Sequence, residues 1–533
     1  DYNNGRTGML AHCTSGLNPF VNTPVSQDCL DIISAPINTE TVLTQDQVEL
    51  NLQGSLADIP AGDLRFAIGA AYRNNDFAYK PDPAFSTTNT TSLTIGLFDT
   101  SPTHGEVTAK EIYGELLIPI FKDQAFARSL SLNLGGRYSD YSTTGGVFTW
   151  KATGDWDVTG WLKIRGGYQQ ANRAPNVAEL YQPPVFQTVP WPDHDPCSMF
   201  TRATYGNVAS NPDRAKVQAL CSALSGGAPI GDNFSGNVPS YFPLGRDLQR
   251  GNPNLDNEKA KTWTIGAVLT APAGSSPLLQ RLRLSVDYYN ITINGAIAPA
   301  STQLVYQECF NSLGNNPNYD PNNEYCQRIQ RTGTPPIAGN WIATEASFEN
   351  LGMISTAGFD VQLDWSVPAP GFGGESGAVF TNIVFNYLDK YKVQNNPGGP
   401  VFDYANSIGS TIFVPPYGAQ FRWKLNTSLG YDFGPGQVSV NWRHYPSARN
   451  VALVTNSTAT QTKTRAYDIV DLAGQFRINK MFVVRAGIDN LFDRDPNIIG
   501  AIPGTTSAVG EPDPAGTYDV LGRRFYIGAK VEF

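Results

Sequence analysis

The chain has 533 residues, of which 16% are charged and 11% aromatic, with 51 glycines, 24 tyrosines and a net charge of −9. The acidic balance argues against a nucleic-acid-binding role, which needs basic patches. The composition favours β structure rich in turns over helices. No apolar run reaches the roughly 18 residues of a membrane helix, so any membrane contact is expected through strands.

Segments of alternating apolar and polar residues recur along the chain and predict about fifteen strands. Several have ten residues or more, as in membrane-spanning strands, which need about 9–11, whereas strands of soluble proteins are nearer five or six. In chain order they are 47–56, 63–72, 107–120, 129–141, 147–156, 161–170, 260–269, 281–293, 354–365, 379–391, 421–433, 437–445, 467–478, 481–491 and 525–533. No linker-like seam divides them, so we expect one continuous architecture.

The last strand, FYIGAKVEF, alternates without a break. Its apolar side is expected to face lipid, because successive side chains of a strand point to opposite faces. A strand of a soluble sandwich has the same pattern, so this segment alone does not decide between the two. The residues expected to face lipid are Val48, Leu50, Leu52 and Leu56 in the first strand and Phe525, Ile527 and Val531 in the last.

Short and long connections alternate between these strands. The short ones are LADIPAG, FKDQAFAR, DVTG, 271–279, SVPAPGFGGES, GPG and INK, and YSTTGG (141–146) is a short exception on the other side. Long extracellular loops are expected at about 1–46, 173–259, 294–350, 392–418, 446–466 and 492–519. Two unlike rims predict an all-β fold, a transmembrane antiparallel up-and-down β-barrel with short turns at one end.

Six cysteines fall as three local pairs, each inside one predicted long loop. Fifteen connectivities are possible, and cysteines of different loops could meet over the mouth of a barrel. The local set needs no crossing between loops, and each bond would remove about 3 kcal/mol of loop entropy. We therefore expect three disulfides on the oxidising, outer side: Cys13–Cys29, Cys197–Cys221 and Cys309–Cys326. A metal site would favour closer spacing such as C-x-x-C, which the sequence lacks.

Five stretches together resemble the carboxyl-terminal barrel of TonB-dependent outer-membrane receptors. They are GGRYSDYSTTGGVFTWKATGDW, IRGGYQQANRAPNVAELYQPP (164–184), GNPNLDNEKAKTWTIGA (251–267), AGIDNLFDRDPN (486–497) and LGRRFYIGAKVEF (521–533). The resemblance implies a 22-stranded barrel with a plugged lumen in a Gram-negative outer membrane. It also implies uptake of a scarce nutrient with energy relayed by TonB, ExbB and ExbD. Phe533 resembles the signal that the barrel-assembly machinery reads, although a rim aromatic has the same position.

The chain departs from the family pattern because no plug domain is recognisable in it. Counted back from the last strand, 47–56 is about the eighth of 22, so this chain is expected to hold about 15 of the 22 strands. The plug and first strands would belong to an amino-terminal part, either of the same precursor or of a separate chain. The other expected partners are outer-membrane lipid and lipopolysaccharide.

No catalytic motif, phosphate loop or metal-binding spacing is present, so neither an enzyme nor a cofactor is expected. Arg137 and Arg165 are expected to pair with acids across the barrel wall. His194 lies between RAPN and NPNL, as in haem receptors, but a solvated loop histidine explains it as well. Residues that could line a ligand mouth or equally pack the loops together are Tyr181, Phe186, Trp191, His194, Tyr241, Phe242, Tyr306 and Trp341.

Two functions fit these observations. The favoured one is an active transport receptor that binds a nutrient in its outer loops. The alternative is a cell-surface scaffold or adhesin-like barrel without transport. Siderophore, sugar, cobalamin, haem and peptide remain open as substrates, because the substrate class resides in loop shapes and in the plug.

Overall fold

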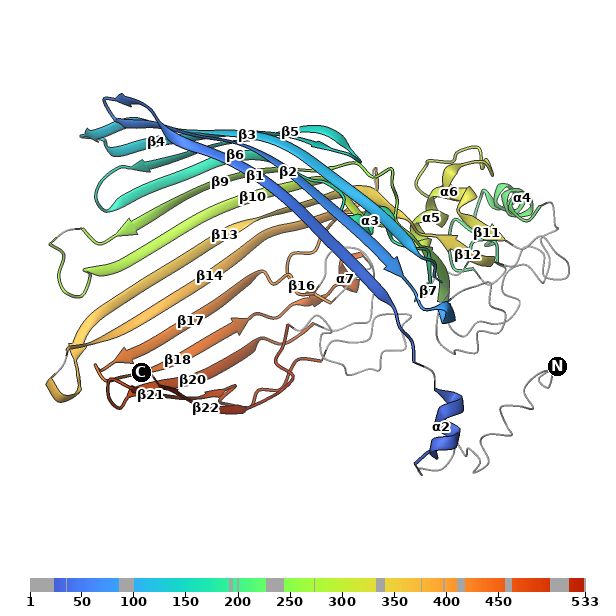
Figure 1. The fold of residues 1–533 in the computed structure, drawn as a ribbon. Helices are drawn as coiled ribbons and strands as arrows, with labels where there is room; N and C mark the ends of the chain where they lie inside the picture. Colours follow the sequence, from blue (N-terminus) through green and yellow to red (C-terminus); the bar gives the residue numbers. More distant parts are fainter. Residues whose placement is uncertain are drawn as a thin grey trace.

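The computed structural model describes residues 24–34, 36–85, 100–190, 195–198, 201–226, 244–272, 274–331, 341–374, 376–395, 398–409, 418–455, 463–498 and 517–531. Most of these residues form one curved antiparallel sheet of 16 strands (Figure 1). One of them, β15 (Val401–Asp403), pairs only with β14, which leaves the fifteen strands that the alternation predicts.

Neighbours in the sheet are also neighbours in sequence, apart from the insertions in the long loops. The path is β1 (Glu40–Ile59), β2 (Gly62–Lys80), β3 (Thr103–Gln124), β4 (Ala127–Tyr141), β5 (Gly145–Asp157), β6 (Leu162–Arg173), β9 (Glu258–Thr270), β10 (Arg281–Pro299), β13 (Phe348–Pro370), β14 (Ser376–Gln394), β17 (Trp423–Asp432), β18 (Gly436–Tyr445), β20 (Tyr467–Arg477), β21 (Phe482–Asp489) and β22 (Arg524–Val531). This is the up-and-down order expected from the sequence.

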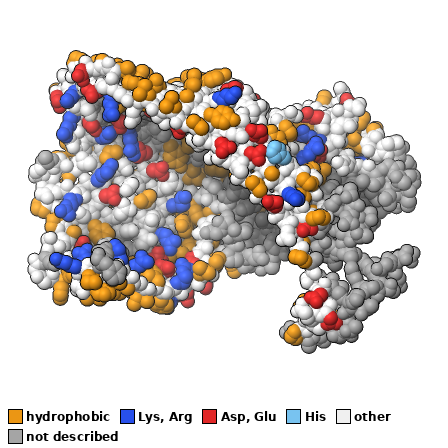
Figure 2. Space-filling view, viewed as in Figure 1, with side chains coloured by type: hydrophobic (Ala, Val, Ile, Leu, Met, Phe, Trp, Pro, Cys, Tyr) orange, Lys and Arg blue, Asp and Glu red, His pale blue; other side chains and the backbone are white. Residues whose placement is uncertain are grey.

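The cross-strand register places apolar and polar side chains on opposite faces. Leu50, Ala70, Ile112 and Tyr138 are paired in one row across β1 to β4 and share one face. The adjacent row, which begins at Glu49, lies on the opposite face. Leu50 is 73% exposed and Ile527 on β22 is 81% exposed, as expected for side chains that face lipid. Figure 2 shows charged side chains over the hollow of the curved sheet. We call the convex side the outer face and the hollow side the inner wall.

Most main strands are longer than the alternation predicts. β1 begins at Glu40 rather than near Gln47, and β13 has 23 residues. Backbone pairing continues past the alternating segments, because a hydrogen-bonded ladder needs no particular side chain. Among the described residues, each of the two edge strands pairs on one side only, and Figure 1 shows β1 and β22 at opposite margins of the sheet.

Short turns lie at one end of the sheet, and the loops with structure of their own lie at the other (Figure 1). The loops hold elements that the sequence analysis did not predict, and most of them are too short to show a clear period. They are α2 (Gln27–Ile33), η1 (Pro83–Phe85), α3 (Val177–Tyr181), β7 (Val185–Pro190), α4 (Arg214–Leu224), β8 (Leu244–Gln249), α5 (Thr302–Cys309), α6 (Glu324–Gln327), β11 (Ile329–Arg331), β12 (Trp341–Glu345), β16 (Ser407–Ile408), β19 (Arg449–Asn450) and α7 (Ala452–Thr455), while η2 (Phe372–Gly374) lies in a short turn.

Candidate functional site

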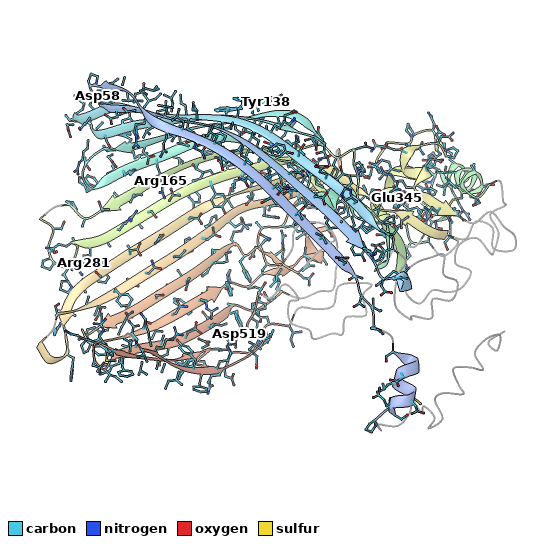
Figure 3. The ribbon with its side chains drawn as sticks, in the orientation of Figure 1. Asp58, Tyr138, Arg165, Arg281, Glu345 and Asp519 are labelled. Atoms are coloured by element: carbon cyan, nitrogen blue, oxygen red, sulfur yellow. A yellow bond between two sulfur atoms is a disulfide. The ribbon has the colours of Figure 1, made fainter. Side chains whose placement is uncertain are left out.

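Ion pairs on the inner wall link strands that lie one or two places apart in the sheet. Arg137 on β4 donates from Nε to Glu111 on β3 at 3.2 Å, and Arg165 on β6 binds Asp287 on β10 through two hydrogen bonds of 2.8 and 2.7 Å (Figure 3). Lys151 repeats the pattern with Glu115 at 2.8 Å. The expectation that Arg137 and Arg165 pair with acids is confirmed. These pairs satisfy the charges within the wall, so they leave neither arginine as a single free binding group.

The RAPN motif forms a structural clamp at the loop end of β6. Arg173 donates to both Glu258 and Glu179 with hydrogen bonds of 2.7 to 2.9 Å. Asn176 and Glu179 form a capping box that begins α3, each side chain accepting from the backbone of the other residue. Glu258 also accepts from the backbone N–H of Ile297 at 2.7 Å. The motif therefore ties β6, β9, β10 and α3 together.

The NPNL motif closes the same junction from the other side. The backbone N–H of Asn252 donates to the carbonyl of Glu179 at 2.9 Å, and its side-chain amide donates to the carbonyl of Phe348 at 2.8 Å. Leu255 is buried beside Leu180 of α3. At Gly251 an added Cβ would come within 2.5 Å of the backbone nitrogen of Gln182, so only glycine fits there. Both motifs act in loop anchoring.

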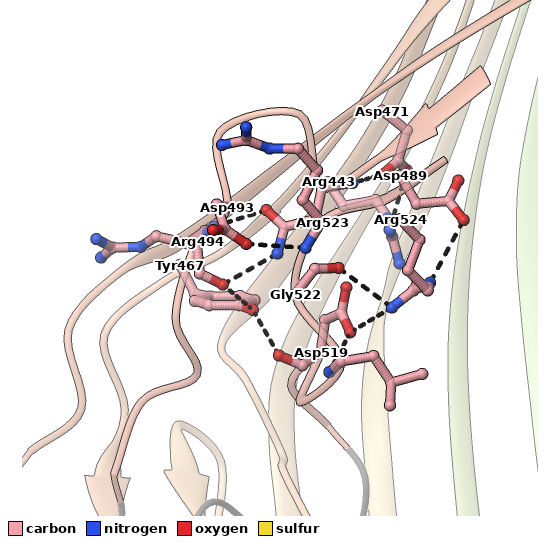
Figure 4. Close-up of polar contacts among 12 residues, drawn as sticks. Arg443, Tyr467, Asp471, Asp489, Asp493, Arg494, Asp519, Gly522, Arg523 and Arg524 are labelled. Atoms are coloured by element: carbon pink, nitrogen blue, oxygen red, sulfur yellow. Dashed lines mark hydrogen bonds and ion pairs between the residues drawn. The ribbon is translucent and has the colours of Figure 1, made fainter. Parts of the chain in front are cut away.

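The carboxyl-terminal motif forms a polar cluster where β18, β20, β21 and β22 meet (Figure 4). Asn490 and Asp493 have left-handed φ angles of 51° and 54°, a conformation that Asn and Asp tolerate better than most residues. The side chain of Asn490 brackets Arg494, accepting from its N–H at 2.7 Å and donating to its carbonyl at 3.1 Å. Asp493 accepts from the backbone N–H of Arg523 at 2.8 Å. DNLFD thus fastens the β21–β22 connection to the start of the last strand.

Asp519 completes this cluster. Its carboxylate accepts from Arg524 at 2.9 Å and from the backbone N–H of Leu521 at 2.9 Å. Partial burial favours the neutral acid, but these hydrogen bonds outweigh it and hold the pKa of Asp519 below its usual range. The Asp519 carboxylate is therefore ionised at neutral pH.

Two long loops merge into one compact unit, which we call the outer-loop subdomain. It comprises residues of 174–257 and 300–347 and includes the sheet β11-β12-β8-β7, in which β12 and β8 from different loops pair in parallel. Its buried core contains Val217, Leu220, Val305, Tyr306 and Phe310 together with four cysteines. Glu345 of this subdomain (Figure 3) binds Arg250 at 2.7 Å. The loops thus have a core of their own.

The disulfides confirm two of the three predicted pairs. Cys197–Cys221 and Cys309–Cys326 are both formed within single loops. Cys29 is disulfide-bonded and fully buried, while Cys13 lies outside the described residues. The local pairing that the sequence predicts therefore holds for both described pairs.

A buried ion pair joins the two disulfide loops. Arg331 donates to both carboxylate oxygens of Asp195 at 2.7 Å, and their side chains are 0% and 8% exposed. Burial opposes the charge, yet the adjacent Asp195 carboxylate raises the pKa of Arg331 above its usual value. Sequence reasoning missed this pair, because its members are far apart in the chain and neither belongs to a motif.

A second buried acid, Asp247, lies on β8 within the loop sheet. It is 2% exposed, opposite Thr344 in the register, and its Oδ1 has no hydrogen-bond partner. Burial raises the pKa of Asp247 to about 7. Asp247 is therefore partly protonated at neutral pH.

The predicted mouth residues are placed differently from one another. Tyr181 packs on β3, where a Cβ at Gly105 would lie 2.0 Å from its ring, and Tyr306 is fully buried in the subdomain core. Both pack the loops. Phe186 lies on β7 and Trp341 on β12. The other four predicted mouth residues lie outside the described part of the chain: Trp191, His194, Tyr241 and Phe242. The proposed assembly signal Phe533 also lies outside it.

A hollow of about 400 Å³ opens on the inner wall beneath the loop that precedes β17. Its polar groups belong to adjacent strands, and Asn386 donates to Asp360 across β14 and β13 at 2.7 Å. A carboxylate, an amide, an ammonium group and aromatic rings converge here, which suits a polar ligand. It is lined by Tyr289, Thr356, Asp360, Asn386, Leu388, Tyr391, Ala419, Gln420, Phe421 and Lys424.

The described residues contain no cluster of His, Cys, Asp and Glu that could hold a metal ion. Within the same ranges, no helix has the length and apolar character needed to cross a membrane.

Comparisons with known proteins agree with this architecture. The family model described as TonB dependent receptor-like, beta-barrel, matches residues 3–491. Similar solved structures include a mutant ferric enterobactin receptor of Pseudomonas aeruginosa (14% identity, TM-score 0.55, 92% of this chain and 55% of that chain) and the siderophore receptor PirA of Acinetobacter baumannii (13%, 0.52, 93% and 55%). The FrpB iron transporter of Neisseria meningitidis is also similar (12%, 0.50, 92% and 55%).

At these identities the solved structures establish the fold alone, and the chain spans about 55% of their length. No curated protein matches in sequence. The family model covers most of the chain, and its members are transport receptors of the Gram-negative outer membrane. The chain therefore belongs to the TonB-dependent receptor β-barrel family.

Proposed function

We propose that this chain is the carboxyl-terminal barrel part of an outer-membrane receptor that binds a scarce nutrient at its outer loops. Import would use energy relayed through TonB, in the outer membrane of a Gram-negative bacterium. The observation that carries the proposal is the asymmetry of the sheet, with an apolar outer face, an ion-paired inner wall and structured loops at one end. An apolar outer face suits lipid, and a polar interior suits a plugged lumen.

An amino-terminal part is the first proposed partner. An open strand edge in lipid leaves unpaired backbone groups, each of which costs several kcal/mol. Strands β1 and β22 present such edges, and further strands would close the barrel between them. The same part would carry the plug and the contact with TonB, ExbB and ExbD. Phe533 would guide insertion by the barrel-assembly machinery.

The proposed ligand contacts lie in two places. One is the loop mouth, where Phe186, Trp191, His194, Tyr241, Phe242 and Trp341 remain candidates, whereas Tyr181 and Tyr306 already pack the loops. The other is the hollow beneath the loops. A ligand that leaves the mouth toward the lumen would meet Asp360 and Lys424 next.

Uptake assays on a deletion strain test the proposal. Loss of the receptor gene is expected to abolish uptake of one nutrient from a labelled set of ferric siderophores, haem, cobalamin, sugar oligomers and peptides. A strain without TonB should show the same loss, and the full-length receptor should restore uptake. Unchanged uptake of every compound, together with lost surface adhesion, would favour the scaffold function instead.

A variant pair tests the hollow as a contact site. Asp360→Asn is expected to weaken binding of the identified nutrient about tenfold, equivalent to about one lost hydrogen bond to a charged group. Asp58→Asn, at an exposed position near the short-turn end of β1 (Figure 3), is the matched control and should bind normally. Equal affinities of the two variants would remove the hollow from the ligand path.

A further inference from the structure

Four lysines lie on the outer face of the sheet at the loop end, and we call them the lysine band: Lys259 and Lys261 on β9, Lys390 and Lys392 on β14. The register connects them. Lys261 lies opposite Thr292, Thr292 opposite Ser355, and Ser355 opposite Lys392, so one row crosses β9, β10, β13 and β14. Directly paired residues of antiparallel strands share a face.

Side-chain contacts show that this row shares the outer face with aromatic residues. The hydroxyls of Thr292 and Ser355 are 3.1 Å apart. Trp263, two residues beyond Lys261 on the same face, contacts Tyr288 at 4.9 Å between ring centroids, and Tyr288 contacts Phe359 at 4.8 Å. An aromatic belt therefore lies next to the lysine band, on the side toward the membrane.

A β-bulge brings the two β14 lysines to the outer face. Gly358 lies opposite Leu388, but Ala357 lies opposite Lys390, so Asp389 is the extra residue. Without this insertion the alternation of β14 would point Lys390 and Lys392 into the lumen. Three of the four lysines are exposed and Lys390 is half-buried.

The lysine band carries positive charge that no described acidic side chain neutralises in an ion pair. Among the described residues, none of the four lysines forms an ion pair. On the outer face of β2 and β3, by contrast, His104 contacts Asp76 at 2.8 Å. Near the band, Asp389 is exposed at the bulge, and Asp403, opposite Lys392, already accepts from two backbone N–H groups.

We propose that the lysine band binds the phosphate groups of lipopolysaccharide in the outer leaflet. The proposal rests on the proposed outer-membrane location. Aromatic belts mark the membrane–water interface, and ammonium groups just beyond them lie at the depth of lipid headgroups. Lysines contribute to such binding mainly as flexible point charges whose stems cover apolar surface. The partner would occupy the outer face, separate from the ligand path in the lumen.

Lipid binding by the purified full-length receptor in non-ionic detergent tests this. The double variant Lys261→Gln/Lys392→Gln should bind phosphorylated lipopolysaccharide about 25-fold more weakly, since each lysine near an anionic surface contributes about fivefold. The control Lys122→Gln/Lys480→Gln, at exposed positions of the short-turn end, should bind normally. Binding by the parent should weaken with salt and with enzymatically dephosphorylated lipopolysaccharide, and inorganic phosphate alone should compete poorly.

Equal binding by the two double variants, or equal binding of phosphorylated and dephosphorylated lipid, would overturn the assignment. If the double variant is poorly folded, as judged by heat-modified gel migration, Lys261→Gln alone should still show about a fivefold loss. Nutrient binding distinguishes this proposal from the proposed transport function, because it should stay unchanged in both double lysine variants. If the parent receptor binds lipopolysaccharide but takes up none of the tested nutrients, only the transport proposal is contradicted.

Discussion

The inner wall and the outer-loop subdomain use charge in opposite ways. On the wall, ion pairs such as Arg165–Asp287, whose side chains are 47% and 27% exposed, link strands one or two places apart. In the subdomain, the pair Arg331–Asp195 is almost completely buried and joins two loops. Exposed pairs contribute about 0–1 kcal/mol each, whereas breaking a buried pair costs about 3–5 kcal/mol.

The difference follows from what holds each region together. The wall is fixed by long ladders of backbone hydrogen bonds, so its side chains can specialise for the lumen and for lipid. The subdomain has short elements and depends on two disulfides, a small core and one buried ion pair. A single substitution should therefore disturb the loops far more than the wall.

The largest expected effect is at the buried pair. Arg331→Ala should destabilise the outer-loop subdomain by about 3–5 kcal/mol, because it leaves the Asp195 carboxylate buried without its cation. Hydrogen exchange of the loop amides should rise while that of the strands does not. Arg165→Gln on the wall is the control, and a comparable change there would contradict the contrast between the regions. The double variant Asp195→Leu/Arg331→Met should recover much of the loss.

Removing a disulfide should have the next largest effect. Cys197→Ala/Cys221→Ala is expected to cost the subdomain about 3 kcal/mol, because the unfolded loop regains conformational freedom. Limited proteolysis within 198–220 should accelerate, and melting of the strands should be unchanged. Equal protease resistance with and without the bond would show that the loop core suffices.

Lipid-facing substitutions test the wall itself. Ile527→Lys should cost about 2–4 kcal/mol if Ile527 lies at the membrane midplane, whereas Val531→Lys near the rim should cost little. Refolding titrations into lipid vesicles would measure both. Cysteines placed at these two positions should also react more slowly with water-soluble thiol reagents than cysteines at Tyr526 and Lys530. Equal labelling at all four positions would contradict the assigned faces.

The smallest expected effect is a pH dependence confined to the subdomain. The pKa of Asp247 is raised from 3.8 to about 7 in the folded state, so the folded state binds its proton more tightly than the unfolded state. The contribution of Asp247 to the stability of the folded subdomain is therefore greatest below pH 4 and falls as the pH rises toward 7. Loop unfolding should become easier by about 2 kcal/mol between pH 5 and pH 7. Asp247→Asn should abolish that slope, and a slope retained in the variant would assign it elsewhere.

Periodicity was enough to predict the main sheet. Residues such as Leu50 and Ile527 lie on the expected face because a strand allows only two side-chain directions. The local cysteine pairs Cys197–Cys221 and Cys309–Cys326 followed from their placement within single loops. The roles of the RAPN and NPNL residues did not follow, since a clamp such as Arg173–Glu258 joins residues far apart in sequence.

The sequence by itself determined the antiparallel strand order and the two faces of the sheet, because both depend on local alternation and on connection length. Only the tertiary structure decided which loops merge, that Tyr306 is core rather than mouth, and that a bulge at Asp389 turns two lysines outward. These features depend on contacts between distant segments and on a one-residue register shift. Neither leaves a periodic signal in the chain, so only folded coordinates reveal them.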